Sequence, residues 1–247
     1  MNDRPDDPES GAGEPRPPKI KAEDNPWYLL ATLYGVPQSW SDGLREKNRV
    51  AWNRYFAADL DEETRASLIE EKRRPAEELT PFSLEELQEV KRAFAKCCKA
   101  SKKKLALPAS DAEIDFSNVK FEQDVFFEGY VFSRPPGFQS AAFSGWASSD
   151  GATFSGEAGF DGATFSGVAG FVCAKFLRSS SFVNAEMKGE TSFGGRYSIR
   201  SLPNSPAPSF IRARFGVKSF GHRTQNTRTR PGASSTPTPV SNSKWTD

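Results

Sequence analysis

The sequence predicts a mixed fold, in which a β-solenoid of about four coils of 22 residues follows a small all-α region and both ends of the chain are disordered. Three observations predict it. Large apolar residues recur at alternating steps of five and six positions, a small residue lies two positions before most of them, and the composition changes at both borders of this pattern.

Phenylalanine sets the period of the repeat. From Phe116 the large apolar residue advances by five, six, five and six positions, and four steps make 22 residues. Such a fixed period is typical of a solenoid, and it sorts the sites into four columns that we expect to be inward stacks. Within this run Ser149 stands where a ring is expected. The expected core is Phe116, Phe121, Phe127, Phe132, Phe138, Phe143, Phe154, Phe160, Phe165, Phe171, Phe176, Phe182, Met187 and Phe193.

A small residue precedes most large ones by two positions, as Ala152 precedes Phe154, and therefore points to the same side of an extended chain. Four short extended segments per coil, each giving one ring and one small side chain to the interior, would fill a narrow square tube. The turns between them need small, flexible residues. We expect these turns at Ser155-Gly156, Asp161-Gly162 and Ser166-Gly167.

At these residues the chain resembles the pentapeptide-repeat family, whose unit is a small residue, a variable one, a central Leu or Phe, and two more variable residues. Ala152 to Gly156 and Ala163 to Gly167 fit this unit, within a repeat region that we place at residues 112–200. The resemblance implies a right-handed quadrilateral β-helix. The chain departs from the family's unit by a sixth residue in alternate steps, which we expect to bulge two opposite corners: Asp124, Pro135, Trp146, Glu157, Val168, Ser179 and Glu190.

Two other folds compete with the square tube. A Phe-rich β-sandwich would alternate with a period of two, and a left-handed hexapeptide β-helix would place Ile, Leu or Val at a constant step of six. Neither pattern fits steps of five and six. The first coil has larger residues where later coils have Ala, and we interpret it as a capping coil: Ile114, Val119, Val125 and Tyr130.

Residues 24–104 are expected to form an α-helical domain. Asn25 and Pro26 predict the start of a short apolar helix. A second helix is expected from about Ser41 to Phe56 and a third from about Asp61 to Arg74. A fourth begins at a capping box formed by Ser83 and Glu86, with Phe82 and Leu87 placed for a hydrophobic staple, and its apolar stripe is Leu87, Val90, Phe94 and Cys97 or Cys98.

Aromatic residues are dense in this helical domain. Its segments 25–35 and 49–56 are similar to the N-terminal region of a subset of bacterial pentapeptide-repeat proteins, a resemblance that implies no particular activity. In a helical domain of this size such rings are usually core residues. A partner groove is one alternative, and a cover over the open end of the solenoid, where Phe116 and Phe121 would otherwise be exposed, is another.

Both ends of the chain differ from the repeat. Residues 1–22 are acidic and proline-rich and are expected to be disordered. Residues 201–247 form a basic low-complexity tail of net charge +6, also expected to be disordered, for which contact with nucleic acid or an acidic membrane is the alternative reading. The sequence shows neither a signal peptide nor an apolar membrane span, so we expect a cytoplasmic protein.

The sequence predicts no enzymatic activity and no catalytic, cofactor-binding or metal-binding residues. The one histidine, His222, lies in the tail, so the folded part cannot form a Ser-His-Asp or Cys-His arrangement. The glycines of residues 145–170 follow the solenoid period and form no phosphate loop. Cys97, Cys98 and Cys173 lack metal-ligand spacing and are expected to be buried or inert thiols in a reducing compartment.

Two functions fit these observations. The first is a non-catalytic scaffold for protein–protein interactions, with partner and oligomeric state left open. The second is implied by the resemblance, because some pentapeptide-repeat proteins mimic DNA and bind type II topoisomerases, which confers quinolone resistance. Such mimicry needs a strongly acidic surface. Residues 113–200 carry ten acidic and seven basic residues, and a net charge of −3 is weak for that task.

The inserted sixth residues also predict a contact surface. Asp124, Trp146, Val168 and Glu190 are spaced by 22 residues and should line one corner on successive coils. There Trp146 and Val168 would be adjacent and exposed, and tryptophan is enriched among interaction hot spots. The alternative is that Trp146 folds inward and fills the space beside Ser149.

Overall fold

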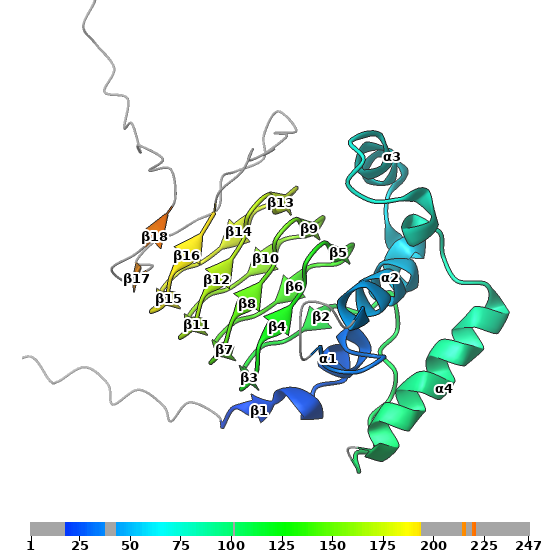
Figure 1. Ribbon diagram of the computed structural model, residues 1–247, viewed down its shortest axis with the longest axis horizontal. Helices are drawn as coiled ribbons and strands as arrows, with labels where there is room; N and C mark the ends of the chain where they lie inside the picture. Colours follow the sequence, from blue (N-terminus) through cyan, green and yellow to red (C-terminus); the bar gives the residue numbers. More distant parts are fainter. Residues whose placement is uncertain (1–17, 38–42, 101, 194–213, 216–218, 221–247) are drawn as a thin grey trace, which may run out of the picture.

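The structure of the protein is a computed structural model that describes residues 18–37, 43–100, 102–193, 214–215 and 219–220. Helices lie at one end of a stack of short parallel strands (Figure 1). The α-helices are α1 Pro26–Ala31, α2 Leu44–Phe56, α3 Glu62–Glu70 and α4 Leu84–Ala100, and the 3-10 helices are Ala22–Asp24, Ala57–Asp59 and Ala76–Leu79.

Side-chain caps fix where three of the α-helices begin. Asn25 Oδ1 accepts from the backbone N–H of Tyr28 (3.0 Å), and Asp61 caps α3 through the N–H of Thr64 in the same way. At α4 the expected capping box is formed, since Ser83 Oγ accepts from the N–H of Glu86 and the Glu86 carboxylate accepts from the N–H of Ser83. Each cap satisfies backbone donors that the first turn leaves open.

Two helix borders differ from the sequence expectation. The helix α3 ends at Glu70, before the expected Arg74, because Lys72 adopts a left-handed conformation (φ 54°) and the N–H of Arg73 bonds to Leu68 O (2.9 Å). The helix α2 is described from Leu44, and the expected start at Ser41 lies outside the described residues.

The strands form four parallel sheets, one for each side of the tube. Sheet I contains β2 Ile114–Asp115, β6 Pro136–Gly137, β10 Ala158–Gly159 and β14 Ser180–Ser181. Sheet II contains β1 Ile20–Lys21, β3 Val119–Phe121, β7 Ala142–Phe143, β11 Thr164–Phe165, β15 Glu186–Met187 and β17 Arg214–Phe215. Sheet III contains β4 Val125–Phe126, β8 Ala147–Ser148, β12 Ala169–Gly170, β16 Thr191–Ser192 and β18 Ser219–Phe220. Sheet IV contains β5 Val131–Phe132, β9 Thr153–Phe154 and β13 Lys175–Phe176.

The rings of each sheet stack along the axis of the tube. Phe116, Phe138, Phe160 and Phe182 form the longest stack, with 4.9, 4.8 and 4.6 Å between successive ring centroids and interplanar angles of at most 9°. These distances equal the spacing of hydrogen-bonded parallel strands. The register of one 22-residue coil on the next, as in Phe165 on Phe143, therefore places each ring directly over its equivalent.

The expected core residues line the interior of the tube. All of them are buried except Phe193, which is partly buried and packs against the last coil. The small residues two positions earlier, such as Ala141 and Ala163, are also fully buried. Ser149 is buried at the site that lacks a ring, so the stack of sheet III is interrupted between Phe127 and Phe171.

The corners of the tube are of two kinds. Those between sheets I and II and between sheets III and IV contain one residue with φ between 56° and 70° on each coil, such as Gly162 of the expected turn Asp161-Gly162. The other two corners are opposite each other and hold the inserted sixth residues. Here glycine permits close stacking, since a Cβ atom on Gly167 would lie 2.3 Å from Gly145 O. In these corners Ser166 is exposed, whereas Ser155 Oγ is buried.

Aromatic residues of the helical domain close the open end of the tube. The indole of Trp52 is fully buried, with its ring centroid 5.4 Å from that of Phe132 and 6.4 Å from that of Phe116, and its Nε1 donates to Val131 O (3.1 Å). Tyr28 makes an edge contact with Phe121 at 5.6 Å. The core of the helical domain and the cover of the solenoid are thus one continuous buried cluster.

The segment between α3 and Pro75 binds one corner of the tube over three coils, and we call its residues 71–74 the arginine strap. Arg74 Nε donates to Gly129 O (2.6 Å) and its Nη2 to Gly151 O (3.2 Å), while Arg73 donates to Cys173 O (2.5 Å). Glu71 pairs with the buried Lys175, which holds the pKa of the Glu71 carboxyl below its usual range. The helical domain is therefore fixed to the side of the solenoid as well as to its end.

Residues 1–22 are expected from the sequence to be disordered, but the last residues of this segment have regular secondary structure. Ile20–Lys21 form β1, which pairs with Val119–Lys120 of β3, and Lys21 is followed directly by a 3-10 helix. The physical reason is that the outer edge of β3 offers unpaired backbone groups, which a strand of two residues satisfies. Residues 1–17 lie outside the described residues.

The C-terminal segment differs in a similar way from the expected tail without repeats. Arg214–Phe215 pair with β15 and Ser219–Phe220 pair with β16, so sheets II and III each gain a strand beyond the fourth coil. The spacing from Met187 to its partner Phe215 is 28 residues rather than 22. The remaining residues of 201–247 lie outside the described part of the chain.

Replacing Phe160 with Ala should remove a ring from the middle of the longest stack. We expect the free energy of unfolding to fall by about 3–5 kcal/mol, because transfer and cavity terms add in a tube that cannot collapse. Ser166→Asp, at an exposed corner, should change stability by less than about 0.5 kcal/mol. Chemical denaturation measured by circular dichroism checks this, and equal losses for both variants would contradict the assignment of the stacks.

Replacing Trp52 with Ala should uncover the first coil. We expect a loss of about 3–5 kcal/mol, accompanied by a lower melting temperature for helical and strand signals together, because one buried cluster joins the two parts. Leu84→Ala, at a side chain that is 83% exposed, is the control and should be nearly neutral. Separate melting of the two signals in the Trp52 variant would show that the end cover is not part of one cooperative unit.

Candidate functional site: an acidic groove on sheet I

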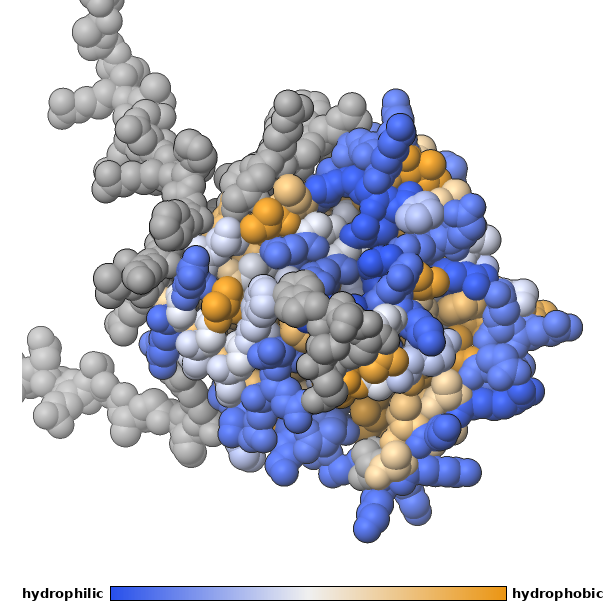
Figure 2. Space-filling view, in the orientation of Figure 1, coloured by the Kyte–Doolittle hydropathy of each residue, from blue (hydrophilic) through white to orange (hydrophobic). Residues whose placement is uncertain are grey.

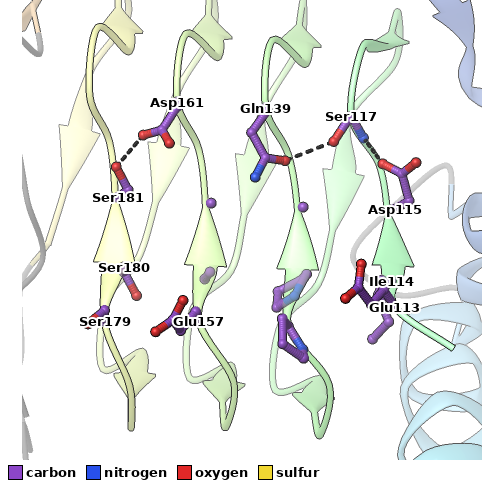
Figure 3. Close-up of a pocket in the computed structure, with 15 residues that line it drawn as sticks. Glu113, Ile114, Asp115, Ser117, Gln139, Glu157, Asp161, Ser179, Ser180 and Ser181 are labelled. Carbon is purple, nitrogen blue, oxygen red and sulfur yellow. Dashed lines mark hydrogen bonds between the residues drawn. The ribbon is translucent and has the colours of Figure 1, made fainter. Parts of the chain in front are cut away.

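A groove of about 730 Å³ runs along the outer face of sheet I (Figure 3). Successive side chains of a strand point to opposite sides, so the second residue of each strand of sheet I faces outward while the first faces the core. The floor of the groove is therefore formed by these outward residues of four successive coils: Asp115, Gly137, Gly159 and Ser181.

Two corners of the tube form the edges of the groove. One edge contains three of the inserted sixth residues, and the other is the corner with left-handed residues. The sixth residue thus forms a rim beside the sheet. The first edge is lined by Glu113, Pro135, Glu157 and Ser179, and the second by Ser117, Gln139 and Asp161.

Hydrogen bonds hold the second edge in place. Asp115 Oδ1 accepts from the N–H of Ser117 (2.7 Å), and Ser117 Oγ donates to Gln139 Oε1 (2.8 Å). Asp161 Oδ1 accepts from Ser181 Oγ and from the N–H of Val183 (2.9 Å). In Figure 3 Ser117 meets Gln139 of the next coil, and Asp161 meets Ser181 of the coil that follows it. The polar groups of this edge are therefore positioned by the repeat itself.

Glycine on the floor gives the groove its depth. A Cβ atom on Gly159 would lie 2.3 Å from Gln139 Nε2, and one on Gly137 would lie 2.7 Å from Gln139 Oε1. The amide of Gln139 therefore lies over the two glycines. Movement of this one side chain would open the floor over two coils.

The groove is acidic. Its lining contains four carboxylates and no basic residue. Glu113 and Glu157 are exposed, and neither makes an ion pair or side-chain hydrogen bond with a described residue. They are two coils apart, which corresponds to roughly 9.6 Å along the axis at the usual strand spacing. The groove therefore presents two available negative charges at the spacing of alternate coils, beside two that the repeat already holds in place.

The predicted contact residues lie together at the corner between sheets II and III. Val168 O accepts from the N–H of Ala147, and Asp124 Oδ1 accepts from the N–H of Trp146 (2.8 Å). Asp124 and Glu190 are exposed, and Val168 is 40% exposed.

Trp146 lies on the outer surface of the tube but is only partly exposed. Its side chain is half-buried and its ring meets that of Phe126 edge-on at 6.1 Å. Phe126 is the outward residue of β4, so Trp146 packs on the outside of the tube rather than beside Ser149. Phe126 also meets α2, because the guanidinium carbon of Arg45 lies 3.3 Å from the centre of the Phe126 ring. The sequence pattern missed these two neighbours, because neither belongs to the repeat columns.

Other candidate chemistry is limited within the described residues. They contain no group of three His, Cys, Asp or Glu residues arranged for a metal ion. The three cysteines are free, and Cys173 is exposed at a left-handed corner position instead of buried. His222 lies outside the described part of the chain. Of the helices that the structure describes, none has both the length and the apolar character that a transmembrane helix requires.

The four-sided tube, its 22-residue register and its surface groove define a β-solenoid repeat protein. A family model described as pentapeptide repeats (9 copies) matches residues 116–163 and 150–195. Residues 116–195 therefore form a pentapeptide-repeat solenoid, which makes up about a third of the chain. No curated protein and no solved structure matches the chain significantly.

The groove was missed by the sequence analysis, although the sequence contains a signal for it. Residues one position before the rings of sheet I are Asp115, Gly137, Gly159 and Ser181, which are small or acidic on every coil. A search for inward rings ignores these outward positions. Their consequence appears only when the coils are stacked.

Removing Trp146 should remove a partly accessible indole. In acrylamide quenching of the intrinsic fluorescence, we expect Trp146→Phe to reduce the quenchable fraction modestly, because the ring is half-buried against Phe126. Trp52→Phe, which removes a fully buried indole, should raise that fraction. If the two variants change quenching in the same direction, the placement of Trp146 on the outer surface is wrong.

Proposed function

We propose that this protein is a non-catalytic interaction scaffold, and that the groove on sheet I binds an extended, cationic segment of a partner protein. The observation that carries the proposal is the lining of the groove, with four carboxylates, a glycine floor and no basic residue. A rigid surface that repeats every coil loses little conformational freedom on binding, which favours affinity.

The spacing of the available carboxylates supports an extended ligand along the axis. Glu113 and Glu157 are separated by about two strand spacings, roughly 9.6 Å. Three residues of a polyproline II segment extend about 9.3 Å. Basic side chains at every third position of such a segment would therefore meet both carboxylates, while the segment's backbone lies over Gly137 and Gly159.

The chemistry of the lining supports binding rather than turnover. The groove is lined by carboxylates, serine hydroxyls, one amide, two prolines and small or apolar residues. It offers no histidine, cysteine or lysine to pair with a serine as general base. Residues of this kind form hydrogen bonds and ion pairs with a ligand.

The alternative function is DNA mimicry toward a type II topoisomerase. A mimic of the phosphate lattice should be acidic over a long surface of the rod. In this solenoid Glu113 and Glu157 of one groove contrast with the exposed Lys120 and Lys188 on the side of sheet II. This distribution favours one acidic docking face over a mimic of the duplex.

The corner of Asp124, Trp146, Val168 and Glu190 is a second proposed contact. Its support is the apolar surface that Val168 and the accessible part of Trp146 present between two carboxylates. A cytoplasmic location also belongs to the proposal, and it is supported by three free cysteines in a chain whose Cys173 is exposed.

Neutralising the groove should weaken binding of a cationic ligand. We expect the double variant Glu113→Gln, Glu157→Gln to bind a fluorescent peptide with arginine at every third position about 3- to 30-fold more weakly than the wild type, since each exposed ion pair contributes up to about 1 kcal/mol. Fluorescence anisotropy at 50 mM and 200 mM salt measures the loss, and a peptide of inverted charge is the ligand control.

The matched protein control is Glu122→Gln, Glu186→Gln, which removes the same charge from the side of sheet II. It should leave binding unchanged, and an equal loss would move the site away from the groove. A pull-down from native lysate with wild type and groove variant then identifies the partner that depends on the groove. Inhibition of topoisomerase supercoiling by the wild type but not by the groove variant would favour the alternative function.

A further inference from the structure

The second half of α4 carries a dense set of cations. Between residues 91 and 104 the sequence has seven basic residues and no acidic one. All seven are exposed, and hydrophilic side chains project from this end of α4 in the space-filling view (Figure 2). We call this set the basic face: Lys91, Arg92, Lys96, Lys99, Lys102, Lys103 and Lys104.

The packing of α4 aims the basic face away from the protein. Val90, Phe94 and Cys98 are buried on the opposite side of the helix. Arg92, Lys96 and Lys99, at positions i, i+4 and i+7, therefore form one line on the solvent side, about 10 Å long at 1.5 Å per residue. Lys102, Lys103 and Lys104 follow the helix in the sequence and are exposed as well.

Most of these cations have no ion pair within the described residues. Arg92 pairs with Glu89, and Lys103 Nζ lies 2.6 Å from Asp24 Oδ1. No ion pair joins the other five to a described carboxylate. The positive charge of the basic face is thus largely available to a ligand.

The end of α4 keeps a lysine where glycine is favoured. Lys102 has a φ of 57°, its N–H bonds to Lys99 O (3.2 Å), and the N–H of Lys103 bonds to Cys98 O (2.9 Å). This is the pattern of a Schellman turn, whose left-handed residue is usually glycine. The helix dipole favours cations in the last turn, but Lys91 and Arg92 lie two turns earlier. Helix stability alone therefore does not explain the basic face.

We propose that the basic face binds the phosphate backbone of a nucleic acid without reading its sequence. A line of cations along a helix complements a linear polyanion better than it complements a single phosphate group. Between residues 91 and 104 no exposed aromatic, Asn or Gln side chain is present to stack on bases or read their edges. The contacts are therefore to phosphates.

The same residues argue against an acidic membrane as the ligand. A helix that binds a bilayer inserts its apolar side chains into it. In α4 those side chains are buried in the protein, and its exposed Leu84 lies at the other end of the helix from the basic face. A lipid surface is left with electrostatic adsorption only.

The test is binding of fluorescein-labelled mixed-sequence oligonucleotides, single-stranded and double-stranded, followed by anisotropy from 50 to 200 mM salt. For the full-length variant Arg92→Gln, Lys96→Gln, Lys99→Gln we expect affinity about 10- to 100-fold lower at the lowest salt. The slope of log affinity against log salt should decrease by about two to three, close to one unit per lost phosphate contact. Circular dichroism verifies that the variant remains folded.

Two variants matched in charge isolate the site. Lys47→Gln, Lys120→Gln, Lys188→Gln removes three exposed lysines elsewhere, and Arg223→Gln, Arg228→Gln, Arg230→Gln removes three of the seven positive charges of the C-terminal segment. Both should retain the wild-type slope. If either variant loses binding as much as the α4 variant does, if the α4 variant binds as the wild type does, or if vesicles with 30% phosphatidylserine bind where oligonucleotides do not, the proposal is wrong. Salt-sensitive self-association that the α4 variant abolishes, without oligonucleotide binding, would also overturn it.

Discussion

One distance governs this molecule. Hydrogen-bonded parallel strands and stacked phenyl rings both prefer a separation near 4.8 Å, and each coil of the tube satisfies both at once. Any change in the number of residues within a strand would break this match on every later coil. The sixth residues are therefore tolerated only at the corners, where they extend the outline of the tube but leave the register of the rings unchanged. The groove on sheet I is a product of that tolerance, since Pro135, Glu157 and Ser179 form one of its edges.

The two ends of the solenoid are covered in different ways. At the first coil Tyr130 packs against Trp52 of the helices, with 5.5 Å between the ring centroids, and donates its hydroxyl to Ala31 O (2.7 Å). Burial raises the pKa of the Tyr130 phenol far above its usual range, so this hydrogen bond keeps its donor at any ordinary pH. At the other end β17 and β18 continue two of the four sheets.

The sequence predicted the tube and the helix caps because both are local or strictly periodic. The columns from Phe116 to Phe193 follow from the period of the repeat alone. A capping box at Ser83 depends on only four neighbouring residues. The arginine strap and β1 were missed because each is defined by contacts between segments 55 to 104 residues apart, and two or four residues carry no pattern of their own. For β17 and β18 a signal existed, in the five-residue steps from Phe210 to Phe215 and Phe220, but the 28-residue offset broke the period. The groove depends on outward positions, which a core-based analysis does not weigh.

The arginine strap has a consequence for the order in which the protein is completed on the ribosome. Residues 71–74 are synthesised about 100 residues before Cys173 and Lys175, the last groups that they bind. Trp52 and Tyr28 likewise emerge before Phe116, Phe121 and Phe132, which cover them. The helical domain therefore leaves the ribosome with its apolar surface open, and Arg73 and Arg74 still lack their carbonyl acceptors on the solenoid. Its strap contacts are complete only when three coils of the solenoid have been made, so that a later part of the chain determines when the first part is complete.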